Sequence, residues 1–339
     1  MLRVAINGYG RIGRNVHRQF VQRFSDQVEV VAINASTDSE VRAYLLKHDS
    51  IHGKFDAEVE VVSNDAISVN KKEVVVLKER DPAKLPWKKL KIDVVVESTG
   101  KFRTTELAGG HLTSGANRVV ISAPPKDDTP TFVKGVNDEQ LTGDMAIISN
   151  ASCTTNCIAP VIKVIDEEFG IEHGLISTVH AYTASQNLLD NKPPGSKDIR
   201  RARSTTISMI PTTTGAVKAC GIIFPHLKGK LHGMALRIPL PTVSVAYMAL
   251  EMKKNISAED INAALKKAAD GAMKGILGFS EEPLVSIDFQ SDPRSSIVDA
   301  MSTEVVDGKA AQILSWYDNE WGYAMRLTEM VVRVGELML

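Results

Sequence analysis

Residues 4–13 read Val4-Ala5-Ile6-Asn7-Gly8-Tyr9-Gly10-Arg11-Ile12-Gly13, a short apolar strand that runs directly into a glycine-rich turn. A helix-like segment follows at residues 14–24, and a second apolar strand follows at residues 28–34. Strand, glycines, helix and strand in this order within roughly thirty residues are typical of a dinucleotide-binding unit. An ordinary βαβ turn is the alternative interpretation.

The three glycines have separate physical roles in such a turn. Gly8 permits the tight turn, Gly10 lets the backbone approach a pyrophosphate, and Gly13 lets the helix pack closely on the strand. The helix N-terminus adds backbone N–H groups that bind an anion. We therefore expect a dinucleotide cofactor at this turn.

A second informative stretch is Ser152-Cys153-Thr154-Thr155-Asn156, which leads into the apolar run at residues 157–165. The isoleucines and valines of that run recur at three- and four-residue spacing, which predicts a helix with Cys153 at its N-terminal edge. Unpaired N–H groups and the helix dipole favour a thiolate there, the form that acts as a nucleophile. The alternative is a buried structural cysteine. The small hydroxyl neighbours favour the nucleophile, because they leave room for a substrate.

Composition limits the class of protein. A chain of 339 residues is long enough for two domains, and 40 basic against 41 acidic residues favour neither nucleic acid nor an anionic membrane as partner. The sequence has no apolar run of about eighteen residues and no signal-peptide pattern at its start. Its three cysteines give no disulfide framework. We expect a cytoplasmic protein.

The two halves of the chain differ in their strand patterns. In the first half, short apolar strands alternate with helical or polar stretches, which predicts an α/β fold with a doubly wound, mostly parallel sheet. After Cys153 the β segments are longer and alternate in polarity, and a helix is expected at residues 257–273. This pattern indicates an α+β domain whose sheet has one face solvated or paired with another subunit.

An irregular polar segment at residues 184–204 interrupts the second half. It contains Asn191-Lys192-Pro193-Pro194-Gly195-Ser196 and Arg200-Arg201-Ala202-Arg203. Such a segment is too long for a routine connection, so we expect it to be functional or to contact a partner.

Three blocks together resemble the phosphorylating glyceraldehyde-3-phosphate dehydrogenase family. They are Ile6-Asn7-Gly8-Tyr9-Gly10-Arg11-Ile12-Gly13-Arg14, Ser149-Asn150-Ala151-Ser152-Cys153-Thr154-Thr155-Asn156-Cys157, and Trp316-Tyr317-Asp318-Asn319-Glu320-Trp321-Gly322-Tyr323. The resemblance covers essentially the whole chain. It implies an N-terminal Rossmann-type domain at residues 1–152, completed by residues 319–339, a catalytic domain at residues 153–318, and a homotetramer.

The implied reaction is the reversible oxidation of D-glyceraldehyde 3-phosphate, with inorganic phosphate as the second substrate. An aldehyde releases hydride poorly, but a thiolate that adds to the carbonyl makes a hemithioacetal whose carbon can pass hydride to a nicotinamide. Cys153 is the nucleophile by its helix-edge position and by resemblance. The family pattern places the base at His180, and His173, His226 and His232 are its rivals.

The resemblance also implies two phosphate sites and a set of cofactor contacts. The substrate phosphate corresponds to Thr183 and Arg237. The attacking phosphate corresponds to Ser152, Thr154, Arg201, Thr214 and Gly215. The cofactor-binding positions are Gly8, Gly10, Arg11, Ile12, Gly13, Ala35, Ser36, Arg80, Ser122 and Asn319. Arginine forks and hydroxyls suit phosphate oxygens, although Arg200, Arg201 and Arg203 can also form a solvated or subunit-contacting charge run.

Cys157 lies four residues after Cys153, a spacing that a metal site or a disulfide could use. Zinc requires more ligands than this, so we expect no metal and assign Cys157 to packing behind Cys153.

The sequence departs from the NAD-specific pattern at Ala35. In NAD-specific members an acidic residue follows the second strand and accepts hydrogen bonds from the ribose 2′-OH. Here the strand is followed by Ala35-Ser36-Thr37, which removes the carboxylate and supplies hydroxyls that suit a 2′-phosphate. We expect NADP to be preferred, with NAD possible if Asp38 or the loop at residues 191–196 compensates.

Other functions stay open at this point. Within the family, the alternative is an erythrose-4-phosphate dehydrogenase, which shares the thiol and the histidine. Outside it, the alternatives are a Cys-His hydrolase, which has no need of the glycine turn, and a non-catalytic binding protein. The sequence does not give the physiological direction, glycolytic or gluconeogenic, or the ratio of affinities for the two cofactors.

Overall fold

A computed structural model describes residues 1–193 and 197–338 of the chain. The chain divides into two compact units. The first unit comprises residues 1–132, 137–151 and 324–339, and the second comprises residues 133–136 and 152–323. Pro194, Gly195 and Ser196, part of the loop expected at residues 191–196, lie outside the described residues, as does Leu339.

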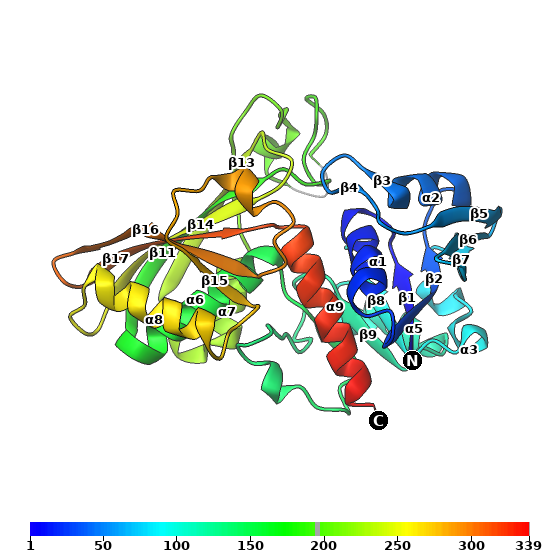
Figure 1. Cartoon of the computed structure of the whole chain (residues 1–339), viewed down its shortest axis with the longest axis horizontal. Helices are drawn as coiled ribbons and strands as arrows, with labels where there is room; N and C mark the ends of the chain where they lie inside the picture. Colours follow the sequence, from blue (N-terminus) through cyan, green and yellow to red (C-terminus); the bar gives the residue numbers. More distant parts are fainter. Residues whose placement is uncertain (194–196, 339) are drawn as a thin grey trace. The chain divides into compact units, whose positions relative to one another are not determined.

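The sheet of the first unit is parallel over most of its width (Figure 1). Its strand order is β10-β9-β8-β1-β2-β7-β6-β5, with parallel pairing from β10 to β7 and antiparallel pairing from β7 to β5. The strands are β1 (Leu2–Asn7), β2 (Val28–Asn34), β5 (Val59–Ser63), β6 (Ala66–Val69), β7 (Lys72–Leu77), β8 (Val94–Glu97), β9 (Arg118–Ile121) and β10 (Ile147–Ser149). The predicted parallel sheet is confirmed, and the antiparallel edge of β5 and β6 was not foreseen.

The first unit also contains the helix that follows the glycine turn. This helix, α1 (Arg11–Arg23), begins three residues earlier than the sequence pattern predicts, because Gly10 has an extended backbone and the helix starts directly after it. Smaller elements complete the unit: α2 (Ser39–Lys47), β3 (His48–Asp49), β4 (Gly53–Lys54), α3 (Trp87–Leu90), α4 (Thr105–Ala108) and α5 (Gly110–Thr113).

The second unit is built on a mixed sheet. Its strand order is β12-β13-β11-β14-β17-β16-β15, in which β11 pairs parallel with β13 and antiparallel with β14. The strands are β11 (Ile171–Ala181), β12 (Ile210–Thr213), β13 (Leu231–Ile238), β14 (Ser244–Met252), β15 (Leu277–Ser280), β16 (Ser296–Val306) and β17 (Ala310–Tyr317). The predicted α+β organisation is confirmed.

Three helices lie on one side of this sheet: α6 (Cys153–Phe169), α7 (Ala216–Ile223) and α8 (Ala258–Asp270) (Figure 1). Their apolar residues form one core with the inward-facing residues of β11, β14 and β17. Each fully buried isoleucine of α6 contributes about 1.5–3 kcal/mol by leaving water. Ser257 caps α8 and Asp260 completes the capping box, so the predicted helix start is confirmed. The last helix of the chain is α9 (Trp321–Glu336).

Candidate active site

Cys153 is the first residue of α6. Ser152 caps the helix with an extended backbone, and its Oγ accepts a hydrogen bond from the Thr155 amide at 3.0 Å. The preceding residue, Ala151, has a φ of 56°, a left-handed conformation that a residue with a Cβ rarely adopts. The predicted position of Cys153 at a helix N-terminus is therefore confirmed, and a strained residue precedes the cap.

His180 lies near the end of β11 and faces this cysteine. Its Nε2 is 3.4 Å from the Cys153 Sγ. Because β11 is paired on both edges, by β13 and β14, the backbone that carries the histidine is fixed. Tyr317, at the end of β17, packs edge-on against the imidazole, with 5.9 Å between ring centroids. The second unit thus brings a thiol and an oriented imidazole together.

The other ring nitrogen of His180 has two neighbours that require opposite protonation. Nδ1 is 2.7 Å from the Ala181 carbonyl oxygen and 2.6 Å from Nη1 of Arg237. A protonated Nδ1 donates to the carbonyl and leaves Nε2 as an acceptor for the Cys153 thiol proton. An unprotonated Nδ1 accepts from Arg237 and places the ring proton on Nε2, facing the sulfur. The site therefore accommodates both a base and a proton donor at Nε2.

Burial sets the charge states of this pair. It lowers the pKa of His180 to about 3, with the Arg237 cation as the second cause, so the imidazole is neutral near pH 7. Burial also raises the pKa of the Cys153 thiol, against the opposing charge of Arg237. Burial thus outweighs the effect of the helix N-terminus, which was expected to favour a thiolate. Arg237 is the nearby side chain whose charge favours ionisation.

Two predicted phosphate ligands next to the cysteine have structural partners. Ser152 Oγ serves as the helix cap and lies 2.7 Å from Thr155 Oγ1. Thr154 is buried, and its Oγ1 is 2.9 Å from the hydroxyl of Tyr317. A phosphate at either hydroxyl would have to share it with these partners.

Thr183 and Arg201 are linked through one serine. Thr183 Oγ1 is 2.9 Å from Ser185 Oγ, and Nη2 of Arg201 donates to the same Oγ at 2.9 Å. Gln186 Oε1 accepts from the Thr183 amide at 2.9 Å. The structure thus brings together residues that the sequence assigned to two different phosphates.

Thr214 and Gly215 lie at the start of α7. Thr214 Oγ1 accepts from the Ala216 amide at 3.2 Å, and both residues line a surface pocket with Lys218 and His232. Within the part of the chain that the structure describes, no hydrogen bond joins Thr214 to Ser152, Thr154 or Arg201. The residues predicted for the attacking phosphate are therefore not one hydrogen-bonded cluster.

The rival histidines lie on the surface. His173 and His232 are exposed, and Nε2 of His226 is 2.6 Å from a carboxylate oxygen of Asp166. The other cysteines are buried in packing positions. Burial raises the pKa of both Cys157 and Cys220 to about 12, and Cys157 belongs to the core against which Cys153 packs.

The glycine turn of the first unit has the geometry of an anion cradle. Gly8 has a φ of 94°, and its amide donates to the Asn34 carbonyl at 3.0 Å, which ties the turn to the end of β2. A Cβ at Gly13 would lie 2.2 Å from the Gly8 carbonyl oxygen, whereas one at Gly10 would meet no atom within 4 Å. Gly10 caps α1 without a side chain, so the helix N-terminus suits a pyrophosphate. The predicted contacts Arg11 and Ile12 open this helix, and Arg11 pairs with Asp49.

The loop after β2 carries the cofactor-selecting positions. The Ala35 amide donates to the Leu77 carbonyl at 2.9 Å, and Ser36 is exposed. Asp38, the residue considered as a substitute carboxylate, accepts from Nζ of Lys78 at 2.6 Å. The predicted contact Arg80 is also exposed. Asp38, the one carboxylate of this loop, therefore forms an ion pair with Lys78.

The last two predicted cofactor residues lie in different units. Ser122 follows β9 in the first unit, where its amide donates to the Glu97 carbonyl at 2.9 Å. Asn319 is buried in the second unit, and its Oδ1 accepts from the hydroxyl of Ser244 at 2.9 Å.

Several residues of the two sites were missed by sequence reasoning. Tyr317 contacts His180 and Thr154, and its place in the block of residues 316–323 was the available signal. In the first unit, Asn34 donates to Asn7 at 2.6 Å, and Asn7 donates to Glu97 at 2.5 Å. Each of these three residues ends a strand, which is the pattern that could have revealed a buried polar network at this sheet edge.

The described residues contain no group of three or more His, Cys, Asp or Glu side chains arranged to hold a metal ion. Among the helices that the structure describes, none is long and apolar enough to cross a bilayer.

Comparison with known proteins identifies both parts of the chain. Residues 2–105 match the family model "Glyceraldehyde 3-phosphate dehydrogenase, NAD binding domain", and residues 152–319 match "Glyceraldehyde 3-phosphate dehydrogenase, C-terminal domain". The chain is 50% identical over 338 residues to glyceraldehyde-3-phosphate dehydrogenase 2 of Bacillus subtilis, covering 99% of this chain and 98% of that protein. It is 51% identical over 334 residues to the glyceraldehyde-3-phosphate dehydrogenase of Geobacillus stearothermophilus, covering 98% of each chain. It is also 51% identical over 339 residues to that of Mycobacterium avium, covering 99% of each.

Proposed function

The chain belongs to the glyceraldehyde-3-phosphate dehydrogenase family, and on that premise we propose that Cys153 and His180 perform the chemistry and that NADP is the preferred cofactor. It is an oxidoreductase of glycolysis with glyceraldehyde-3-phosphate dehydrogenase activity and an NAD(P)-binding domain. The observation that carries the catalytic proposal is the 3.4 Å contact between the Cys153 Sγ and His180 Nε2.

The reaction begins with a proton transfer and an addition. His180 Nε2 takes the proton of the Cys153 thiol, and the sulfur adds to the aldehyde carbon to form a hemithioacetal. Nδ1 then donates to the Ala181 carbonyl, which stabilises the imidazolium in a fixed orientation. The bound nicotinamide supplies the hydride acceptor for the oxidation of the hemithioacetal to a thioester.

The thioester is then opened by inorganic phosphate. A phosphate oxygen attacks the thioester carbon, the carbon–sulfur bond breaks, and 1,3-bisphosphoglycerate is released. The leaving sulfur takes back the proton held by His180, which regenerates the Cys153 thiol and the neutral imidazole, and the proton of the attacking hydrogen phosphate is released to water. Arg237 and Thr183 are assigned to the substrate phosphate, and Arg201, Ser152, Thr154, Thr214 and Gly215 to the attacking phosphate. The link from Arg201 to Thr183 through Ser185 supports a charged anion site beside His180.

The first unit fits a dinucleotide, and the loop after β2 favours a 2′-phosphate. Open space beside Gly10 and the uncapped start of α1 suit the pyrophosphate. Ala35 has no carboxylate, so it can neither accept a hydrogen bond from the ribose diol of NAD nor repel the 2′-phosphate of NADP. The nearby carboxylate of Asp38 is paired with Lys78. The charges at this position therefore favour NADP.

The cofactor proposal is tested by exchanging one residue. We expect the unmodified enzyme to have the higher kcat/KM with NADP. Ala35→Asp should improve NAD binding by about 1–3 kcal/mol through a charged hydrogen bond and weaken NADP binding by a comparable amount. Ala35→Asn is the matched control, because it adds a polar side chain without charge. A higher kcat/KM with NAD, unchanged by Ala35→Asp, would show that another residue controls selection.

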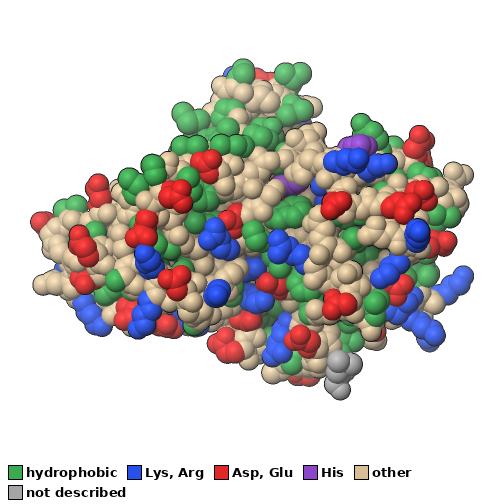
Figure 2. Space-filling model, viewed as in Figure 1, with side chains coloured by type: hydrophobic (Ala, Val, Ile, Leu, Met, Phe, Trp, Pro, Cys, Tyr) green, Lys and Arg blue, Asp and Glu red, His purple; other side chains and the backbone are tan. Residues whose placement is uncertain are grey.

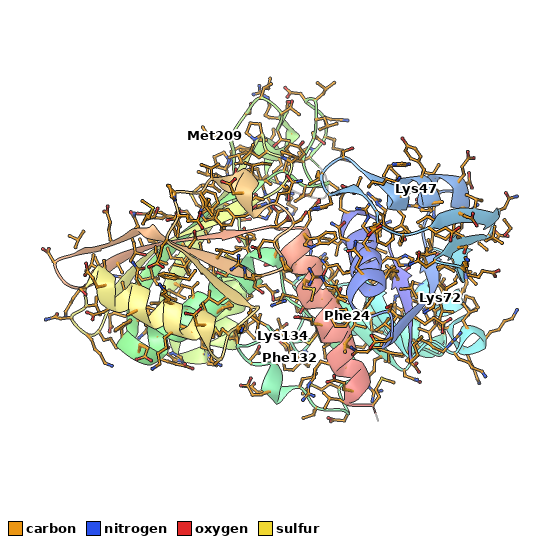
Figure 3. The ribbon with its side chains drawn as sticks, viewed as in Figure 1. Phe24, Lys47, Lys72, Phe132, Lys134 and Met209 are labelled. Carbon is orange, nitrogen blue, oxygen red and sulfur yellow. The ribbon has the colours of Figure 1, made fainter. Side chains whose placement is uncertain are left out.

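We also propose a homotetramer, with residues 184–204 at a subunit interface. Large apolar side chains are exposed on this segment, which lies at the top of the view in Figure 2, and on Met209, which follows it and is labelled in Figure 3. Leu189 and Ile199 are 79% and 78% exposed. Exposed apolar patches are typical of interfaces. Light scattering should give a mass near four chains, and a stable, fully active monomer would refute the placement.

A further inference from the structure

Arg42, on α2, is a buried cation that forms no ion pair with a carboxylate among the described residues. Arg42 is only 8% exposed, and its Nη1 donates a hydrogen bond to the Tyr9 carbonyl at 3.1 Å. Nε is buried without a hydrogen-bond partner, and Nη2 makes no hydrogen bond to the described residues. Within those residues, no carboxylate pairs with Arg42. An arginine that is removed from water usually has such a partner.

A second guanidinium reaches the same carbonyl. Nη1 of Arg14, on α1, donates to the Tyr9 oxygen at 3.2 Å. Burial, and after it the nearby Arg14 charge, lowers the pKa of Arg42, so both disfavour the charged guanidinium. The charge of Arg14 thus adds to the positive potential at Arg42, which an anion bound to Arg42 would offset.

The position of Arg42 relates it to the cofactor turn. Tyr9 lies between Gly8 and Gly10, and the Gly8 amide donates to the carbonyl of Asn34, the residue directly before Ala35. The helix that carries Arg42 begins at Ser39, four residues after Ala35. Arg42 therefore contacts the glycine turn through the Tyr9 carbonyl, and the same turn contacts Asn34, the neighbour of the proposed ribose-selecting residue Ala35. The N-terminus of α1 already offers backbone N–H groups for the pyrophosphate.

We infer that Arg42 recognises the 2′-phosphate of NADP and is a specificity-determining residue, an inference that rests on the proposed cofactor preference. Nη2 is the donor that remains for a phosphate oxygen, and the hydrogen bond to Tyr9 holds the guanidinium in place beforehand. A fixed side chain loses little rotamer entropy on binding. Exposed Arg80, in contrast, must be ordered by the ligand. Arg42 therefore contributes more to 2′-phosphate recognition than Arg80.

The test compares ligands that differ only in the 2′-phosphate. Adenosine 2′,5′-bisphosphate and 5′-AMP are titrated calorimetrically into the full-length enzyme, and NADP and NAD are titrated in parallel. For Arg42→Leu we expect the affinity for the bisphosphate and for NADP to fall on the order of 10- to 100-fold, with a much smaller change for 5′-AMP and NAD. Arg23→Leu is the control, because it removes a cation from the other end of α1, about 18 Å along the helix.

The outcomes separate this inference from the cofactor proposal. If the unmodified enzyme does not distinguish the bisphosphate from 5′-AMP, both fail. If it does distinguish them and Arg42→Leu weakens all four ligands equally, Arg42 only supports the glycine turn and the inference alone fails. Arg42→Lys keeps the charge but not the fork, so an intermediate loss of 2′-phosphate selectivity is expected even if Arg42→Leu does not fold. Unchanged selectivity in the lysine variant at high salt, where charge is screened, would also contradict the inference.

Discussion

The Nε2 atom of His180 lies 3.4 Å from the Sγ atom of Cys153, while burial keeps the imidazole neutral and raises the pKa of the thiol. Cys153 is therefore a protonated thiol and His180 a neutral imidazole when the two are in contact. Ionisation of the sulfur depends on a proton transfer within the pair and on the positive charge of Arg237.

Cys153→Ser should abolish oxidation while leaving cofactor binding intact. A serine hydroxyl does not ionise near neutral pH, whereas a thiol that transfers its proton to His180 does. Activity and cofactor titration on the same preparation measure this. In the unmodified enzyme, mass spectrometry should find iodoacetamide on Cys153 before Cys157 or Cys220, since burial raises the pKa of those two to about 12. Full activity after complete alkylation of Cys153 would exclude it as the nucleophile.

His180→Asn should slow turnover by roughly two to four orders of magnitude, the usual contribution of a positioned acid or base. Cofactor affinity should change little. Tyr317→Phe is the matched control, because it keeps the ring that packs against His180 and removes only the hydroxyl next to Thr154. Single-turnover kinetics should show a far smaller effect for the phenylalanine variant. Equal loss in the two variants would show that loss of a neighbouring hydroxyl slows turnover as much as loss of the imidazole, and would contradict proton transfer by His180.

Arg237→Gln should have two separable effects. It removes a proposed phosphate ligand, so kcat/KM should fall more for glyceraldehyde 3-phosphate than for unphosphorylated glyceraldehyde. It also removes the charge that lowers the pKa of Cys153, so the thiol pKa should rise further and the pH profile of alkylation should move to higher pH. Arg237→Lys should retain much of the second effect, because it keeps the charge. An unshifted profile in the glutamine variant would remove Arg237 from the ionisation of the thiol.

The sequence predicted the parts of this protein that follow from local patterns. The glycine turn at residues 8–13 correctly predicted the strand–helix unit at the start of the chain. The apolar run after Cys153 correctly predicted a helix that begins at the cysteine. Hydrophobic spacing and glycine placement are local properties, so they are visible in a single chain.

What the sequence did not reveal depends on contacts between distant segments. Tyr317 lies 137 positions after His180 and yet packs against it, since β17 and β11 flank β14 in the same sheet. Burial likewise raises the pKa of Cys153, whereas its helix position alone predicts a lowered pKa. Arg201 is linked to Thr183 through Ser185, which lies 16 positions before Arg201 in the sequence. Burial and long-range pairing are set by tertiary structure, which local patterns do not encode.

The stability of the protein should fall as the pH is lowered from 6.5, in part because of His17. This residue is buried in the first unit, where its Nδ1 lies 2.5 Å from the Tyr9 hydroxyl, and burial lowers its pKa to about 3. The unfolded chain has an ordinary histidine pKa of 6.5, so between pH 6.5 and 3 the unfolded state binds a proton that the folded state does not. That difference destabilises the fold by roughly 1.4 kcal/mol for each pH unit below 6.5, and the contribution is fully recovered above pH 6.5.

His17→Gln should therefore lose less stability than the unmodified protein between pH 7.5 and pH 5.5. Glutamine can still accept the Tyr9 hydrogen bond but takes up no proton, so the acid-dependent part of the free energy of unfolding becomes smaller by about 1.4 kcal/mol over this range. Urea unfolding midpoints at the two pH values measure the difference. His232→Gln makes the same substitution at an exposed position and is the control. If the stability of His17→Gln depends on pH as that of the unmodified protein does, His17 must take up its proton in the folded state. The prediction that His17 stays neutral beside Tyr9 would then be wrong.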